Sequence, residues 1–226
     1  MASFKTHVSG GTAVGMAVGA ISLLLGISSY DFGWVILLAV AVIAGSVAPD
    51  IDSDSSIPFH MTFGTLSLLV AVVSAVPIWR LFAGEWLLVI GLPVAIALTV
   101  WFVVGLAFRK VTHHRGMVHS LPAGVLAGLI IFLVGTRIGL TEWQAWLLSV
   151  AFCVGYLLHL VLDEIYAAVN FQGLRIVPKK SFGSALKLFS HSRSANFVVY
   201  AAIAVIVLSN QNRLTVLAGQ LASFVS

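Results

Sequence analysis

Residues 33–52, "GWVILLAVAVIAGSVAPDID", decide the fold of this chain. The segment 33–49 holds no charged side chain and is close to the roughly 20 apolar residues that a transmembrane helix needs. Pro49 interrupts the helical pattern and biases its predecessor towards extended geometry. In an extended segment, Asp50 and Asp52 project to the same side. The stretch therefore predicts a membrane helix that ends in a pair of carboxylates.

The composition extends this interpretation to the whole chain. Of its 226 residues, 60% are hydrophobic and 9% are charged, and the mean hydropathy is +1.07. Soluble domains average roughly 25% charged residues. We therefore predict an all-α fold, a polytopic membrane bundle of about seven transmembrane or membrane-embedded helices. The predicted helices lie at about residues 8–27, 33–49, 62–82, 86–107, 121–139, 143–162 and 195–210.

No charge run, low-complexity tract or soluble segment divides the sequence. We predict one membrane-embedded domain over residues 1–226, with a polar cytoplasmic loop at about 164–194. The first apolar run is expected to be a retained helix, because it is long and no small-residue cleavage site follows it. Cys153 is the single cysteine, so a disulfide framework and a thiolate metal site are excluded.

The cationic residues predict how the helices cross the membrane. If odd-numbered helices leave the side that holds the N-terminus, only Arg80, Arg137 and Arg213 fall on the opposite side. The N-terminal side receives the others, which are Lys5, Arg109, Lys110, Arg115, Arg175, Lys179, Lys180, Lys187 and Arg193. By the positive-inside bias, the N-terminus faces the cytoplasm of an inner membrane. This asymmetry accounts for the net charge of +4, so no nucleic-acid partner is needed.

On this topology the histidines and most acidic residues meet at the cytoplasmic face. His159 and Asp163 are four residues apart, so both point from one face of the sixth predicted helix. His119 precedes Ser120 and Pro122, a plausible N-cap and first-turn proline. We predict a metal centre whose ligands come from His7, Asp50, Asp52, His114, His119, His159 and Asp163.

Imidazole and carboxylate ligands together favour zinc, with manganese or iron as further candidates, over magnesium or calcium. The set is large enough for one or two ions, and two ions about 3.5–4 Å apart are usual in phosphoester hydrolysis. His60 and His191 are expected to be loop residues, and His113 is left unassigned.

Each feature also has an ordinary structural interpretation. The His159–Asp163 pair can be an interfacial hydrogen bond, residues 49–52 a solvated turn, and residues 113–116 a cationic anchor at the membrane surface. A non-catalytic metal-binding protein or a transporter stays open as an alternative. Transport sites usually lie near the bilayer midplane on broken helices, whereas these polar groups lie at helix ends.

The order of three motifs resembles a known family. "PDID" at 49–52, "HRGMVHS" at 114–120 and "GYLLHLVLD" at 155–163, with a histidine near the N-terminus, look like the YdjM-like family of inner-membrane metal-dependent hydrolases. The resemblance covers about residues 7–180 and implies that the seven residues proposed as ligands are the polar signature of that family. The order of ligands is remotely similar to that of zinc-dependent phospholipases C, which implies a phosphoester substrate.

These inferences define an expected mechanism. Arg115 is the candidate residue for a bidentate contact with phosphate oxygens, and Asp52 or Asp54 is the candidate general base. A site at the ends of membrane helices favours a lipid or another membrane-associated phosphoester, which would arrive by lateral diffusion. No His-Glu-x-x-His, Gly-x-Ser-x-Gly or Walker A motif occurs, which argues against zincin, serine-hydrolase and P-loop chemistry.

Overall fold

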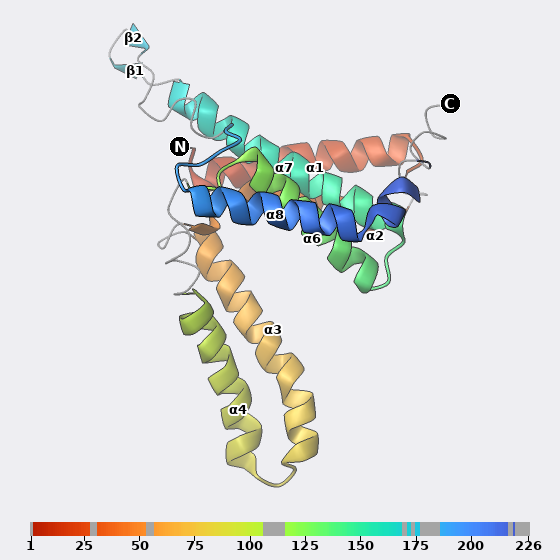
Figure 1. Cartoon of the computed structure of the whole chain (residues 1–226), viewed down its shortest axis with the longest axis vertical. Helices are drawn as coiled ribbons and strands as arrows, with labels where there is room; N and C mark the ends of the chain where they lie inside the picture. Colours follow the sequence, from red (N-terminus) through yellow and green to blue (C-terminus); the bar gives the residue numbers. More distant parts are fainter. Residues whose placement is uncertain are drawn as a thin grey trace. The chain divides into compact units, whose positions relative to one another are not determined.

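The computed structural model of the chain is all-α, as predicted. It describes residues 2–27, 31–52, 57–105, 116–168, 171–172, 175–176, 186–216 and 219. Each of the seven predicted segments contains most of a helix (Figure 1). The α-helices are α1 (Phe4–Leu24), α2 (Phe32–Val47), α3 (Ile57–Leu81), α4 (Trp86–Thr99), α6 (Leu121–Arg137), α7 (Glu142–Ala168) and α8 (Arg193–Ser209).

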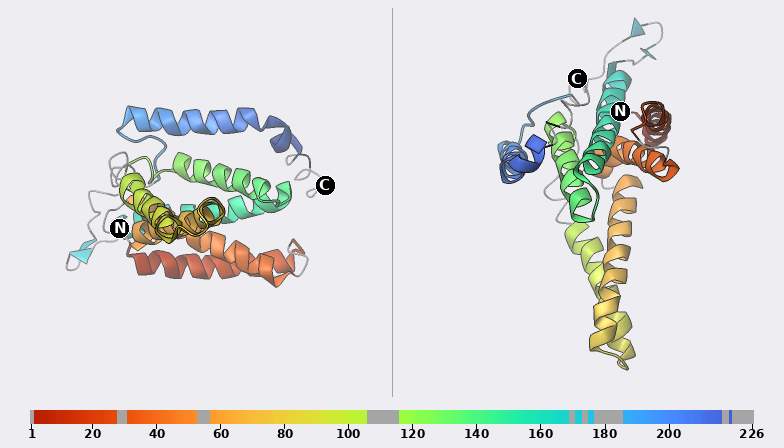
Figure 2. Two further views of the ribbon diagram at one scale, coloured as in Figure 1. Left: turned by 90° about the horizontal axis from the view of Figure 1, so that it is seen from below. Right: turned by 90° about the vertical axis from the view of Figure 1, so that its right-hand side faces the viewer.

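The chain forms two compact units, one of residues 1–49 and 115–226 and the other of residues 50–114. The prediction of a single domain stays a prediction. In the first unit, α7 packs against α1 and α2 on one side and against α6 on the other, and α8 covers α6. Figure 2 shows α8, in blue, on the outer side of α6. The core between α1, α2 and α7 is built on four buried residues, Leu38, Ala41, Val42 and Ala151.

Helix α1 meets α2 through a stripe of small residues. Gly11, Gly15 and Gly19 repeat every four residues and are buried on the same face as His7. A Cβ atom at Gly15 would lie 2.9 Å from the backbone oxygen of Ala39, so a larger residue could not be accommodated without separating the helices. Small residues that bring two backbones together are typical of helix pairs in membranes.

Helices α2 and α7 approach each other more closely than α1 and α2 do, at Gly45 and Gly155. A Cβ atom at Gly155 would lie 2.8 Å from the carbonyl carbon of Val42 and 2.9 Å from the nitrogen of Ser46, both in the backbone of α2. A Cβ atom at Gly45 would meet the backbone of Phe152 and lie 2.9 Å from the nitrogen of Tyr156. The end of α2 is therefore fixed against the part of α7 that comes just before His159.

Helix α6 begins as the sequence predicts. Ser120 is its N-cap, with its hydroxyl accepting a hydrogen bond from the N–H of Ala123 at 3.4 Å, and Pro122 lies in the first turn. The hydroxyl of Tyr156 donates to the backbone oxygen of Val118. The short segment before α6, which includes His119, is thereby held against α7.

The second unit contains the antiparallel pair α3 and α4, and α4 continues into a π-helical turn at Val100–Val104. His60 lies in the first turns of α3 and not in a loop, so that prediction was wrong. Its ring stacks on the indole of Trp101, with centroids 5.7 Å apart and planes at 27°. The helix begins at Ile57, upstream of the predicted start at residue 62, because a proline such as Pro58 is tolerated in a first helical turn. His191 does lie in a loop and is exposed.

The structure differs from the sequence prediction in two segments that carry proposed ligands. Residues 48–52 form a 3-10 helix rather than an extended segment, because the fixed φ of Pro49 also suits a 3-10 turn. Asp50 and Asp52 therefore do not alternate as residues of a strand do. Helix α7 continues to Ala168, so the loop begins after 168 and not at 164. Among the described residues of that loop, Phe171–Gln172 and Arg175–Ile176 form a two-stranded antiparallel ladder.

Candidate metal centre

His7 is placed by the first turns of α1. Ser3 caps the helix, with its hydroxyl accepting from the N–H of Thr6 at 3.2 Å and its carbonyl accepting from the N–H of His7 at 3.1 Å. His7 begins the stripe that continues at Gly11, and its side chain is fully buried. The hydroxyl of Ser46 donates to the backbone oxygen of His7 at 3.1 Å. The backbone of His7 is therefore fixed against the last turn of α2.

His159 is oriented by the backbone of the same serine. Its Nδ1 lies 2.8 Å from the carbonyl oxygen of Ser46. A carbonyl oxygen can only accept, so Nδ1 carries the proton, and the lone pair of the neutral ring is at Nε2. Metal-binding histidines commonly have their second ring nitrogen held in this way, which fixes both the tautomer and the ring plane.

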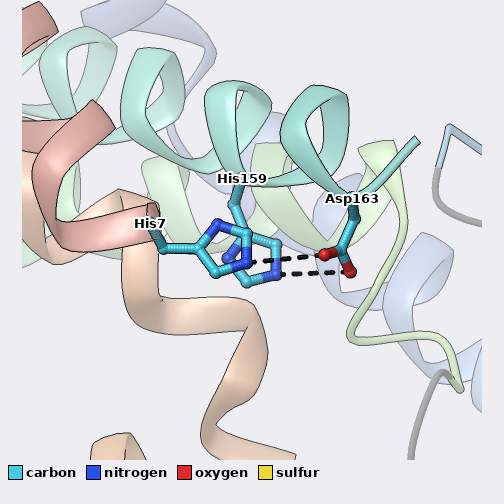
Figure 3. A group of neighbouring side chains, drawn as sticks. All are labelled: His7, His159 and Asp163. Atoms are coloured by element: carbon cyan, nitrogen blue, oxygen red, sulfur yellow. Dashed lines mark ion pairs between the residues drawn. The ribbon is translucent and has the colours of Figure 1, made fainter. Parts of the chain in front are cut away.

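Asp163 lies one turn after His159 and faces both histidines (Figure 3). Its Oδ1 is 3.4 Å from Nε2 of His7, and its Oδ2 is 3.9 Å from Nε2 of His159. The carboxylate is 3% exposed, and its Oδ1 also accepts a hydrogen bond from the N–H of Ala2 at 2.9 Å. The four-residue spacing of His159 and Asp163 thus directs an imidazole and a carboxylate from the same face of α7, as the sequence predicts.

The rings of His7 and His159 are stacked, with centroids 3.8 Å apart and planes at 12°. Two imidazolium cations at this distance would repel each other, whereas two neutral rings can share a cation. His119 lies edge-on to His159, with centroids 5.4 Å apart, and is 1% exposed. Four of the residues predicted as ligands are therefore gathered at one end of the first unit.

The donor set fits a metal ion. The ligand atoms of His7, His159 and Asp163 lie within 4.8 Å of one another. Ligand atoms about 2.0–2.1 Å from a tetrahedral zinc lie roughly 3.3 Å apart. Each carboxylate oxygen of Asp163 is near that separation from one imidazole nitrogen, with Oδ1 at 3.4 Å from Nε2 of His7 and Oδ2 at 3.9 Å from Nε2 of His159. Nδ1 of His7 is buried without a hydrogen-bond partner among the described residues, and Nε2 lies 3.4 Å from Oδ1 of Asp163. Buried polar atoms are normally satisfied, and a cation between the imidazole and the carboxylate would satisfy both Nε2 and the carboxylate charge.

Comparison with family models gives one result that decides the relationship. The model described as YdjM inner membrane protein matches residues 1–226, the whole chain. The chain belongs to the YdjM inner membrane protein family. Comparison with curated proteins and with solved structures gives no match. The resemblance seen in the motifs is therefore confirmed for the family, and with its apolar helices this YdjM protein is a multi-pass inner-membrane protein.

The hydropathy of the helices agrees with this location. Among the described residues, four helical segments are long and apolar enough to cross a bilayer, at Phe4–Leu24, Phe32–Ile51, Trp86–Val103 and Glu142–Ala168. Helices α6 and α8 are apolar and shorter. The protein thus contacts the lipid bilayer over several helices.

The other predicted site residues of this YdjM protein lie either in the 3-10 helix or outside the described residues. Asp50 lies in the first turn of the 3-10 helix and is partly buried. Asp52 ends that helix, and its role stays a prediction. Asp54, His113, His114 and Arg115 lie outside the described residues, so their proposed roles also stay predictions.

Sequence reasoning missed two contributors to the centre, Ser46 and Ala2. Ser46 is fully buried and contacts both histidines, through its hydroxyl and its carbonyl. Ala2 contributes its backbone N–H. Ser46 follows Gly45 in α2, and the small residues of α1 indicate that a partner helix must approach closely. That pattern was a usable signal for Ser46, whereas nothing in the side chain of Ala2 marks it.

Proposed function

We propose that this protein is a membrane-bound, metal-dependent hydrolase that acts on a phosphoester of a lipid or membrane-associated substrate at the cytoplasmic face. The observation that carries the proposal is the buried cluster of His7, His159 and Asp163, brought together from α1 and α7. Polar groups of this kind in a membrane protein are costly and usually functional.

The residues of the chain have distinct roles in this proposal. His7 and His159 bind the ion through Nε2, with the tautomer of His159 fixed by the carbonyl of Ser46. Asp163 supplies a carboxylate oxygen. Zinc, or manganese or iron in its place, would supply a Lewis acid and a more acidic water. From the sequence, Asp50, Asp52, His114 and His119 are further ligands for one or two ions.

The remaining roles follow from the same sequence motifs. Arg115 would hold the phosphate oxygens in a bidentate contact, and Asp52 or Asp54 would accept the proton of the attacking water. The cytoplasmic orientation rests on the distribution of Lys and Arg. A substrate carried by the bilayer can diffuse laterally to the ends of the helices, which supports a lipid over a soluble ester.

One observation favours a second candidate, a metal-binding protein without catalysis. His7 and His159 are 0% exposed, and Asp163 is 3% exposed. Structural metal sites are closed, whereas catalytic sites keep a coordination position open to water or substrate. The two candidates share the same ligands, and turnover separates them.

The test is release of phosphate or headgroup from phosphoester substrates presented in mixed micelles with added zinc or manganese. The wild-type protein is compared with Asp163→Asn, which keeps the shape of the side chain and loses the anionic ligand. His191→Ala, at an exposed loop position, is the matched control. Turnover in the wild type and the control that is lost in Asp163→Asn supports a hydrolase. Zinc binding without turnover on any phosphoester supports the second candidate.

A further inference from the structure

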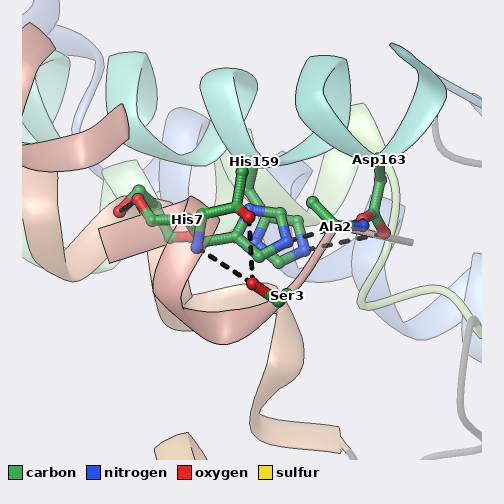
Figure 4. A network of polar contacts seen from close by, with 7 residues as sticks. Ala2, Ser3, His7, His159 and Asp163 are labelled. Atoms are coloured by element: carbon green, nitrogen blue, oxygen red, sulfur yellow. Dashed lines mark hydrogen bonds and ion pairs between the residues drawn. The ribbon is translucent and has the colours of Figure 1, made fainter. Parts of the chain in front are cut away.

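The residue before the cap of α1 contacts the carboxylate of the metal centre. The backbone N–H of Ala2 donates a hydrogen bond of 2.9 Å to Oδ1 of Asp163, across 161 residues of sequence (Figure 4). Asp163 belongs to α7 and Ala2 precedes α1, so this bond joins two separate elements at the centre. Its Oδ1 also faces Nε2 of His7, at 3.4 Å, whereas Oδ2 faces His159.

The geometry of Ser3 explains why the N–H of Ala2 reaches this carboxylate. Ser3 is extended, with φ −84° and ψ 158°, and its hydroxyl accepts from the N–H of Thr6. The cap fixes where α1 begins, and His7 follows one turn later with its own N–H bonded to the carbonyl of Ser3. One short segment therefore sets the positions of an imidazole ligand and of the donor to the carboxylate.

We propose that the backbone N–H of Ala2 is a positioning group of the metal centre. It holds Oδ1 of Asp163 and so presents Oδ2 as the oxygen that binds the ion, which makes Asp163 a one-oxygen ligand. This inference rests on the metal binding in the proposed function and assigns a role to the segment before α1. Ligating carboxylates are themselves hydrogen-bonded, and loss of such a partner typically costs roughly 10–100-fold in metal affinity.

The experiment removes the N–H and keeps the side chain small. Ala2→Pro has no N–H at this position, and Ala2→Gly retains it as the matched control. Both variants and the wild type carry the same N-terminal extension, so that the nitrogen of residue 2 is within a peptide bond. The zinc dissociation constant is measured in detergent by competition with a chromophoric chelator, and thermal unfolding of the metal-free proteins is measured in parallel.

Ala2→Pro is expected to bind zinc roughly 10–100-fold more weakly than Ala2→Gly, with the metal-free unfolding temperatures of the two unchanged. If Ala2→Pro does not fold, a one-glycine insertion between Ala2 and Ser3 replaces it, because the insertion displaces the N–H of Ala2 from Asp163 without introducing a proline. The same loss of zinc affinity is then expected for the insertion variant. Equal affinities for Ala2→Pro and the wild type, or an equal loss in Ala2→Gly, would overturn this inference and leave the metal centre intact. A wild type that binds no zinc would overturn both.

Discussion

Substitution of Gly155 by alanine tests whether the α2–α7 contact positions His159. The new Cβ would lie 2.8 Å from the carbonyl carbon of Val42 and 2.9 Å from the nitrogen of Ser46. Both atoms belong to the backbone and cannot rotate away. The nearest atom would be the backbone oxygen of Val42, and since ordinary contacts begin near 3.4 Å, the helices must separate by more than about 0.6 Å. The 2.8 Å bond from His159 to Ser46 would then lengthen to more than about 3.4 Å, beyond good hydrogen-bond range.

Two measurements follow from that displacement. We expect Gly155→Ala to bind zinc at least about 10-fold more weakly, because the ring of His159 loses its partner. We also expect the free energy of unfolding to fall by about 1–3 kcal/mol, as in other overpacked cores. Gly91→Ala is the matched control, because a Cβ at Gly91 of α4 meets nothing within 4 Å. Wild-type zinc affinity and stability in Gly155→Ala would refute the reasoning.

Three further predictions concern the same unit. Ser46→Ala removes the hydroxyl that donates to His7 and Ile43, and should lower the free energy of unfolding by about 1 kcal/mol in chemical denaturation; an unchanged midpoint would argue against this link between α1 and α2. Ser120→Ala removes the cap of α6 and should cost about 0.5–2 kcal/mol in the same assay, and an unchanged denaturation midpoint would contradict this role of the hydroxyl. Removal of metal with a chelator should lower the melting temperature, and zinc at 100 times its dissociation constant should raise the free energy of unfolding by about 2.7 kcal/mol. A melting temperature that does not change with zinc would contradict a metal site in the folded protein.

The sequence was sufficient to locate the helices because membrane helices are long and apolar. Hydropathy placed all seven segments, and the N-cap of α6 at Ser120 followed from its residue type and from Pro122. The errors came at the ends of helices. His60 lies in the first turns of α3, where its ring packs on Trp101 of the π-helical turn. Residues 48–52 wind into a 3-10 turn, which Pro49 tolerates as well as it tolerates an extended chain.

The candidate site was partly accessible to sequence reasoning. The spacing of His159 and Asp163 on one helix face predicted their shared direction, and the inferred topology brought His7 to the same end of the membrane. The groups that orient these side chains are backbone atoms, namely the carbonyl of Ser46 and the N–H of Ala2. Every residue has a backbone carbonyl, and every residue except proline has a backbone N–H, so no residue type marks these groups, and only the structure reveals which of them meet the centre.

The most direct test of the central claim is the metal content of the detergent-purified protein, measured by elemental mass spectrometry without chelators. Wild type is compared with His159→Ala, which removes a buried ring of the centre, and with His191→Ala, which removes an exposed loop histidine. The account predicts near-stoichiometric zinc, manganese or iron in the wild type and in His191→Ala, and its loss in His159→Ala. A wild type that stays free of metal after ions are added, or a His159→Ala protein with wild-type metal content, would contradict it.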